Sequence, residues 1–255
     1  MASRDRLDAV VLKVTLSPGQ ALAAGVWDGD TGEELTGRVW FCERSDVSPD
    51  RLPLRDAGVI LRLRETLHQR DDTVAQLCPC RRSRIAGHRP TRVEAEWRGE
   101  RRVLSAALTT THAEGTVAGV LARRGPLHGL FSGAQRSFLD ECADCPVDID
   151  ALTVLGPVAV RRWPRLAWSA VELNVEHWQV TAVARGSLDF VELSRRVDPQ
   201  GAEIAQLSLE SGLRRRGVDL WEGAEGVSDH HVLTLLARGD GRLPGNPDTG
   251  PGATP

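Results

Sequence analysis

Two arginines alternate with leucines in the segment GVILRLRET, residues 58–66. Successive side chains of an extended strand point to opposite faces, so Arg62 and Arg64 share one face while Leu61 and Leu63 share the other. Guanidinium groups bind phosphate and carboxylate oxygens through paired hydrogen bonds. The segment is therefore either a solvent-facing strand or a strand that lines a polar cavity and holds an anion there.

Other strand-like segments carry similar side chains at the same two-residue spacing. Their polar faces are rich in Ser, Thr, Gln and Arg, unlike the Glu/Lys mixture of a typical outer surface, and their opposite faces are mostly Val, Leu and Ile. The sets are Ala9, Val11 and Lys13; Val74, Gln76, Cys78 and Cys80; Glu94 and Glu96; Ser105, Ala107 and Thr109; Arg162, Gln179 and Thr181; and Glu192, Ser194 and Arg196. If the strands close into a barrel, these faces line a cavity for an anionic or polar small molecule. The alternative is a solvated outer face with scattered ion pairs.

The elements that must position these side chains are mostly short β-strands. Strand-like segments occur at 7–18, 38–44, 58–66, 72–80, 91–99, 101–111, 152–163, 168–176, 178–185 and 188–197, with a hairpin expected around Gly99. Residues 116–148 have helical spacing broken at Gly125-Pro126, which predicts short inserted helices. Asp198-Pro199 is typical of a helix start and predicts a C-terminal helix. We expect an α+β fold with one antiparallel barrel domain over 1–238 and a disordered Gly/Pro-rich tail at 239–255.

The composition limits the partners and the compartment. The chain has 255 residues, and its formal net charge of −3 argues against nucleic-acid binding, which needs an excess of basic residues. No apolar segment is long enough to cross a membrane, and the N-terminal residues have no apolar core typical of a signal peptide. We expect a cytoplasmic protein with no membrane partner, and the sequence leaves its oligomeric state open.

Five cysteines occur in the chain, at positions 42, 78, 80, 142 and 145. In a cytoplasmic protein we expect them to be reduced. The alternative is a structural zinc site that combines Cys78-x-Cys80 with Cys142-x-x-Cys145, although that ligand spacing is poor for zinc.

The segment RVWFCERSDVSPDRLPLRDAGVILRLRET, residues 38–66, resembles the CYTH, or triphosphate tunnel, superfamily. LFSGAQRSFL, LTVLGPVAV, VELS and RRRGVDL resemble a divergent actinobacterial-type branch of that family. The resemblance extends from about residue 7 to about residue 220. Its members include class IV adenylyl cyclases, thiamine triphosphatases and inorganic triphosphatases.

The resemblance implies an eight-stranded antiparallel tunnel in which basic residues hold a triphosphate and acidic residues bind Mg²⁺ or Mn²⁺. The family's first strand carries Glu-x-Glu-x-Lys, and here Ala9 and Val11 replace the two carboxylates while Lys13 is kept. The positions that match the family's ligand-binding residues are Arg62, Arg64, Lys13, Arg162, Arg196, Gln76 and Thr109, and those that match its acidic, metal-binding residues are Glu94, Glu96 and Glu192.

Three functions remain open at this point. A divalent ion needs hard oxygen ligands, so the loss of the first-strand carboxylates predicts that metal-dependent triphosphatase chemistry is impaired or lost. The favoured function is a repurposed tunnel protein of specialised metabolism that binds or transforms an anionic small molecule, phosphorylated or carboxylated, with Glu192, Lys13 and Glu94 as catalytic groups. The alternatives are a metal-dependent triphosphate hydrolase or nucleotidyl cyclase with Mg²⁺ or Mn²⁺ on the remaining glutamates, and a non-catalytic phosphate or polyphosphate binder. No cofactor is required by the residues themselves.

Overall fold

The computed structural model describes residues 7–26, 33–48, 50–85, 92–182, 186–218, 220 and 229–238. The strands are β1 (Ala9–Leu16), β2 (Leu35–Arg44), β3 (Val59–Thr66), β4 (Asp72–Leu77), β5 (Arg92–Arg98), β6 (Arg101–Thr111), β7 (Leu152–Trp168), β8 (Val171–Ala182) and β9 (Gly186–Val197). The α-helices are α1 (Pro18–Ala23), α2 (Pro53–Asp56), α3 (Arg82–Ile85), α4 (Thr116–Ala122), α5 (Gly133–Cys142), α6 (Ala202–Arg214) and α7 (Asp229–Arg238). Short 3₁₀ turns are η1 (Leu127–Gly129), η2 (Ile149–Ala151) and η3 (Pro199–Gly201). The expected tail at 239–255 lies outside the described residues.

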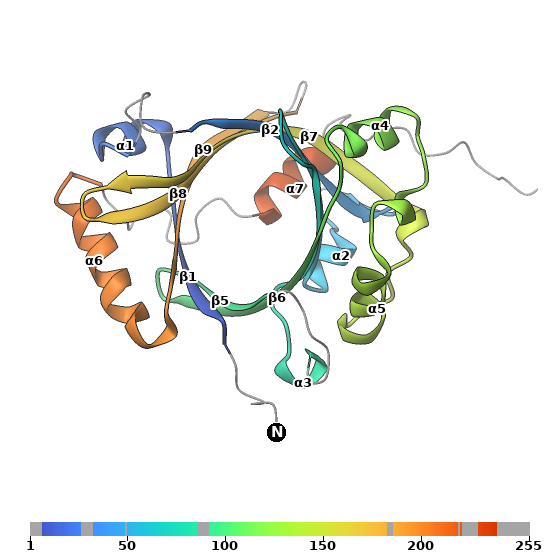
Figure 1. Cartoon of the computed structure of the whole chain (residues 1–255), viewed down its shortest axis with the longest axis horizontal. Coiled ribbons are helices and arrows are strands. Elements are labelled where there is room, and N and C mark those ends of the chain that lie inside the picture. The colour runs from blue at the N-terminus through green and yellow to red at the C-terminus, as the bar shows by residue number, and fades with distance from the viewer. Residues whose placement is uncertain are drawn as a thin grey trace, which may run out of the picture.

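The described strands form one closed barrel in the order β1-β5-β6-β4-β3-β2-β7-β8-β9 (Figure 1). All neighbours are antiparallel except β1 and β5, which run parallel. The expectation of eight antiparallel strands was therefore wrong in number and in direction. The two errors have one cause, because a closed ring of strands can alternate in direction only when their number is even, and nine strands force one parallel pair.

Two apolar cores cover the outside of the barrel. Helices α4 and α5, from the insertion expected at 116–148, pack with the outward residues of β3, β4 and β6 in one core. Helices α1 and α6 pack against outward residues of β1 and β9 in the other. The hairpin around Gly99 joins β5 and β6 as expected. Helix α6 follows Asp198, whose side chain accepts a hydrogen bond from the amide of Gln200.

A third apolar core lies inside the barrel, and it contains a helix that the sequence reasoning did not identify. Helix α7 lies within the ring of strands (Figure 1). Its Val232, Leu233 and Leu236 are buried together with inward side chains of β2, β7, β8 and β9. Trp178 of β8 stacks on Phe190 of β9 in the same core, with ring centroids 6.1 Å apart. One part of the barrel interior is therefore filled by apolar side chains.

Strand β8 continues through the break that was expected after residue 176. A single strand, Val171–Ala182, replaces the two short segments, because His177 is buried and paired within the ladder. No helix among the described residues has the length and apolar character needed to cross a membrane.

Candidate functional site

Strand register brings side chains from five strands together inside the barrel. On β1 and β9, Thr15 lies opposite Glu192, and Lys13 lies opposite Ser194. On the parallel neighbour β5, Glu96 lies opposite Val11. Residues opposite one another in a ladder share a face, so Lys13 lies between the carboxylates of two different strands.

Lys13 is the centre of this interior network. Its Nζ lies 2.9 Å from a carboxylate oxygen of Glu96 and 3.7 Å from one of Glu192. The Lys13 side chain is 19% exposed, and those of the two glutamates are 14% and 15% exposed. Because all three groups are largely removed from water, each charge depends on the others for compensation.

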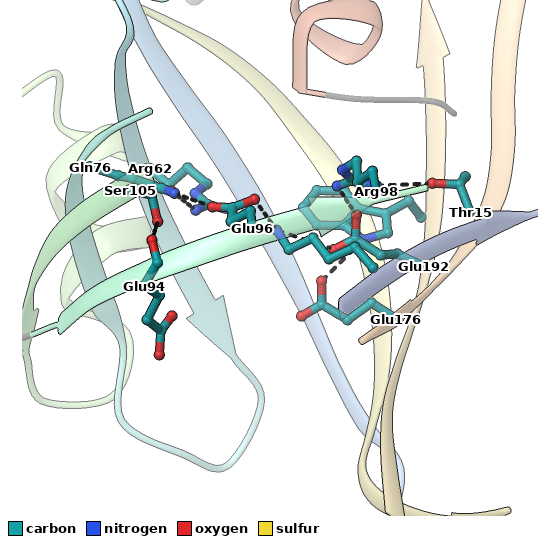
Figure 2. A network of polar contacts seen from close by, with 11 residues as sticks. Thr15, Arg62, Gln76, Glu94, Glu96, Arg98, Ser105, Glu176 and Glu192 are labelled. Atoms are coloured by element: carbon teal, nitrogen blue, oxygen red, sulfur yellow. Dashed lines mark hydrogen bonds and ion pairs between the residues drawn. The ribbon is translucent and has the colours of Figure 1, made fainter. Parts of the chain in front are cut away.

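Arg98 is the second cation of the network. Its guanidinium forms an ion pair with the Glu192 carboxylate and donates a hydrogen bond of 3.1 Å to the hydroxyl of Thr15 (Figure 2). Arg98 ends β5 next to the hairpin turn, and the sequence reasoning did not select it. Its position two residues after Glu96 on the same strand face was a signal that could have identified it.

Arg62 is joined to the network through Gln76. The Arg62 guanidinium donates to the Gln76 amide oxygen, and the Gln76 amide nitrogen donates a 2.8 Å hydrogen bond to Glu96 (Figure 2). The register of β3 and β4 is consistent with these contacts, because Gln76 lies opposite Ile60 and Arg62 lies opposite Val74. The two alternating arginines of β3 therefore face the inside of the barrel.

The ion pairs fix the protonation of the network. Burial opposes the charge on Lys13, but Glu192 and Glu96 outweigh it and raise the pKa of the ammonium above its ordinary value. Burial likewise opposes the charge on Glu96, but Lys13, followed by Arg98 and Arg62, lowers the pKa of this carboxyl to about 2. For Glu192 the same balance of burial against Lys13 and Arg98 lowers the pKa. Lys13 is thus held protonated, and both carboxylates are held ionised.

Arg64 shares the inner face of β3 with Arg62, and Arg162 of β7 lies opposite Glu176 of β8, which in turn lies opposite Glu192. Arg64 Nη1 is 3.9 Å from Asp72, and Arg64 Nε is buried without a hydrogen-bond partner among the described residues. Arg162 donates a 2.6 Å hydrogen bond to the Thr66 hydroxyl. Burial, followed by the charge of Arg64, lowers the pKa of Arg162. The two guanidiniums repel each other; Arg64 has one long ion pair to Asp72, and Arg162 forms no ion pair within 4 Å among the described residues, which is an arrangement suited to an anion.

The remaining predicted residues lie farther out. Arg196 is paired with Glu94 at 2.7 Å, and the Arg196 side chain is about half exposed. Thr109 of β6 lies opposite Val74 and is half-buried on the inner face. Glu94 belongs to the inner face by register, but its carboxylate points away from Glu96 (Figure 2).

One predicted face was wrong. Gln179 and Thr181 do not share a face with Arg162; both are exposed on the outer side of β8. Arg162 lies opposite Glu176, which the sequence reasoning missed. The error arose because the strand was divided at His177, which shifted the alternation by one residue.

The donors do not fit a divalent metal ion. Within the part of the chain that the structure describes, no three His, Cys, Asp or Glu side chains converge as metal ligands. Glu96 and Glu192 contact Lys13 and Arg98 instead, and Glu94 contacts Arg196. A cation would have to displace these ion pairs before it gained two ligands. The cysteines are all free thiols.

Comparisons with known proteins identify the fold. No family model matches the chain, and no curated protein matches it. Among solved structures, the chain is similar to HpAC1 from Hippeastrum, for which a dominant triphosphatase activity is described, with 15% identity, a TM-score of 0.56, and coverage of 88% of this chain and 94% of that one. A protein from Pyrococcus horikoshii aligns with 14% identity, a TM-score of 0.44, and coverage of 83% and 92%. The chain has the tunnel-barrel fold of the Hippeastrum protein.

Proposed function

We propose that this protein binds an anionic small molecule inside its barrel without a divalent metal, as a repurposed member of the triphosphate tunnel fold. The observation that carries the proposal is the ion pairing of Lys13 and Arg98 with Glu96 and Glu192. The first-strand positions that would supply carboxylates are Ala9 and Val11. The interior thus provides internal counter-ions where a metal-dependent enzyme keeps free ligands.

The ligand would contact Arg64 and Arg162 first. Arg64 has one long ion pair, at 3.9 Å to Asp72, and Arg162 forms no ion pair within 4 Å with any residue that the structure describes, whereas Lys13 and Arg98 are already neutralised by glutamates. A phosphate or carboxylate between Arg64 and Arg162 would relieve their mutual repulsion and satisfy the buried Arg64 Nε. Gln76, Thr109 and Arg196 are proposed as more distant polar contacts.

Binding is favoured over catalysis by the protonation of the interior. A general base works best with a pKa near the operating pH, but the pKa of Glu96 is about 2 and that of Glu192 is also lowered. Lys13 stays protonated and cannot act as a nucleophile or a base. We therefore assign Glu192, Lys13 and Glu94 to positioning and charge balance in place of the catalytic roles expected from the sequence.

Calorimetric titration with tripolyphosphate in EDTA tests this proposal. Wild type should bind, and Arg64→Gln and Arg162→Gln should each weaken binding about tenfold or more, as expected for loss of a charge-assisted hydrogen bond. The matched control is Arg38→Gln, because Arg38 lies on the outer face and pairs with Glu65 at 2.7 Å. Equal binding by all four proteins would refute the assignment, and turnover of tripolyphosphate with Mg²⁺ or Mn²⁺ would refute the preference for binding.

A further inference from the structure

Helix α6 carries exposed apolar side chains on the side that faces away from the barrel (Figure 1). Ile204 is 76% exposed and Leu207 is 62% exposed, and residues three positions apart lie on the same side of a helix. Ser211 lies four residues beyond Leu207, and together these three residues form the outer face of α6. On the opposite side, Leu209 and Leu213 are buried in the core that α6 shares with β1 and β9. The helix is therefore apolar on two sides, and only one of them is covered by the described part of the chain.

The residues described after α6 do not cover this outer face. Val218 is 2% exposed and lies in the core beneath the helix, and Leu220 packs against the same core. Asp229 begins α7, which lies within the barrel (Figure 1). The described chain beyond α6 is therefore on the inner side of the helix, and the outer face is available to a second molecule.

One edge of the outer face carries charges that change sign along the helix. Glu203, Glu210 and Arg214 are separated by seven and four residues, so they lie in one row. The side chain of Glu203, in the first turn, is 74% exposed, and that of Arg214, in the last turn, is 48% exposed. Within the chain, Glu203 pairs with Arg102 at 3.5 Å and Arg214 pairs with Glu210 at 3.1 Å. A carboxylate and a guanidinium that are this exposed can each take a second partner.

Two copies of this edge are complementary only when the helices run antiparallel. A two-fold axis perpendicular to α6 places the edge beside the same edge of a second copy in reverse order. Glu203 of each copy then lies beside Arg214 of the other, and Leu207 lies between Leu207 and Ser211 of the other copy. A parallel arrangement would instead place Glu203 beside Glu203 and Arg214 beside Arg214, which the repulsion of like charges disfavours. The charges thus favour a second copy of this chain in one orientation.

We propose that this protein forms a two-fold dimer in which the outer face of α6 packs antiparallel against the same face of a second copy. A helix of 13 residues is about 20 Å long, so the contact is smaller than the ~1,200 Å² of a standard interface and the dimer is weak. We expect a Kd on the order of 100 µM, so that a sample at about 1 µM is monomeric. The contact lies outside the barrel, so this inference goes beyond the proposed ligand binding and does not depend on it.

Sedimentation equilibrium between about 10 µM and 1 mM measures this dimer. Ile204→Glu and Leu207→Glu should each raise the Kd about tenfold or more, because each places a charge at the centre of the contact. The matched control is Leu67→Glu, since Leu67 is 51% exposed directly after β3 and does not belong to α6. The Kd of this control should equal that of wild type, and circular dichroism of every variant establishes that it is folded.

An exchange of charges tests the orientation. Glu203→Arg alone and Arg214→Glu alone should each raise the Kd about tenfold, since each sets like charges side by side across the dimer. The double variant Glu203→Arg/Arg214→Glu should recover a Kd within about threefold of wild type, and a mixture of the two single variants should form a heterodimer. If these charges acted only within one chain, on Arg102, Glu210 or the helix dipole, neither recovery would occur.

The outcomes decide the proposal and separate it from the proposed function. A dimer that Ile204→Glu and Leu207→Glu weaken, that Leu67→Glu leaves unchanged and that the exchange of charges recovers supports the proposal. A wild type that is monomeric at about 1 mM overturns it. A dimer that Ile204→Glu and Leu207→Glu leave intact, or that the exchange of charges does not recover, also overturns it. Tripolyphosphate binding inside the barrel should be the same in all these variants, so either idea can fail without the other.

Discussion

Replacement of Lys13 by methionine gives the sharpest test of the interior network. Methionine preserves most of the side-chain volume but removes the charge, which leaves Glu96 in its buried position with the Gln76 amide as its one hydrogen-bond donor among the described residues. Breaking one side of a buried ion pair costs about 3–5 kcal/mol, and the 19% exposure of Lys13 points to the lower end, about 3 kcal/mol. For a chain of this size the corresponding fall in Tm is roughly 6–12 °C.

Urea unfolding at pH 7, followed by tryptophan fluorescence, measures this loss. The double variant Lys13→Met/Glu96→Gln removes the uncompensated charge and should recover most of the lost stability, to within about 1 kcal/mol of wild type. The control is Arg214→Met, which breaks an exposed pair with Glu210 at 3.1 Å and should cost less than about 0.5 kcal/mol. If Lys13→Met behaves like Arg214→Met, or if the double variant is no more stable than the single one, the network does not carry the buried charge balance described above.

Three further predictions concern acid, the interior helix and a backbone contact. Folding lowers the pKa of Glu96 from an ordinary 4.5 to about 2, so its contribution to the free energy of unfolding is fully present above about pH 4.5 and is lost as the pH falls toward 2. In Glu96→Gln, the free energy of unfolding measured with urea should therefore depend less on pH over this acid range. Leu236→Ala should destabilise the protein by about 2–5 kcal/mol in the same assay, whereas Ile204→Ala, at an exposed side chain of α6, should change stability by less than about 0.5 kcal/mol. Equal effects would show that Leu236 of α7 is not part of the core. Gly37→Ala should cost about 1–3 kcal/mol, because the added Cβ would lie 2.3 Å from the backbone oxygen of Glu65, and an unchanged urea midpoint would contradict that contact.

The strands that the sequence predicted best are those with a strict two-residue alternation. The β3 segment has apolar residues on one face and Arg62 and Arg64 on the other, and the barrel buries its leucines under α4 while both arginines face inward. The local alternation was sufficient there because the leucine face of β3 had to be buried, and this fixed the direction of the arginine face as well. The same reasoning gave the wrong face for Gln179. The polar residue His177 is buried within β8, and its presence in the sequence led to the prediction of two strands where there is one.

The number of strands and the position of α7 depend on contacts between distant parts of the chain. The parallel pairing of β1 with β5 closes the ring, and no local pattern specifies it. Helix α7 has a readable apolar stripe at Val232, Leu235 and Leu236, but only the barrel determines that this stripe packs inside it. Its placement brings Asp229 to the interior cations, which a sequence alone does not reveal.

The candidate site was predictable in its residue types and not in its pairings. Lys13, Glu96 and Glu192 were identified individually, with the two glutamates expected as metal ligands. The structure pairs them with Lys13 and Arg98, because register across the closed barrel sets lysine between the carboxylates.

The most direct test of the central claim is a pair of calorimetric titrations of the wild-type protein with tripolyphosphate, one in EDTA and one in excess Mn²⁺. If Lys13 and Arg98 replace the metal as counter-ions of Glu96 and Glu192, the affinity in EDTA should equal that in Mn²⁺ to within about twofold, after correction for Mn²⁺ bound by free ligand. Binding that occurs only with Mn²⁺ would contradict the claim, because the glutamates would then have to exchange their ion pairs for metal coordination.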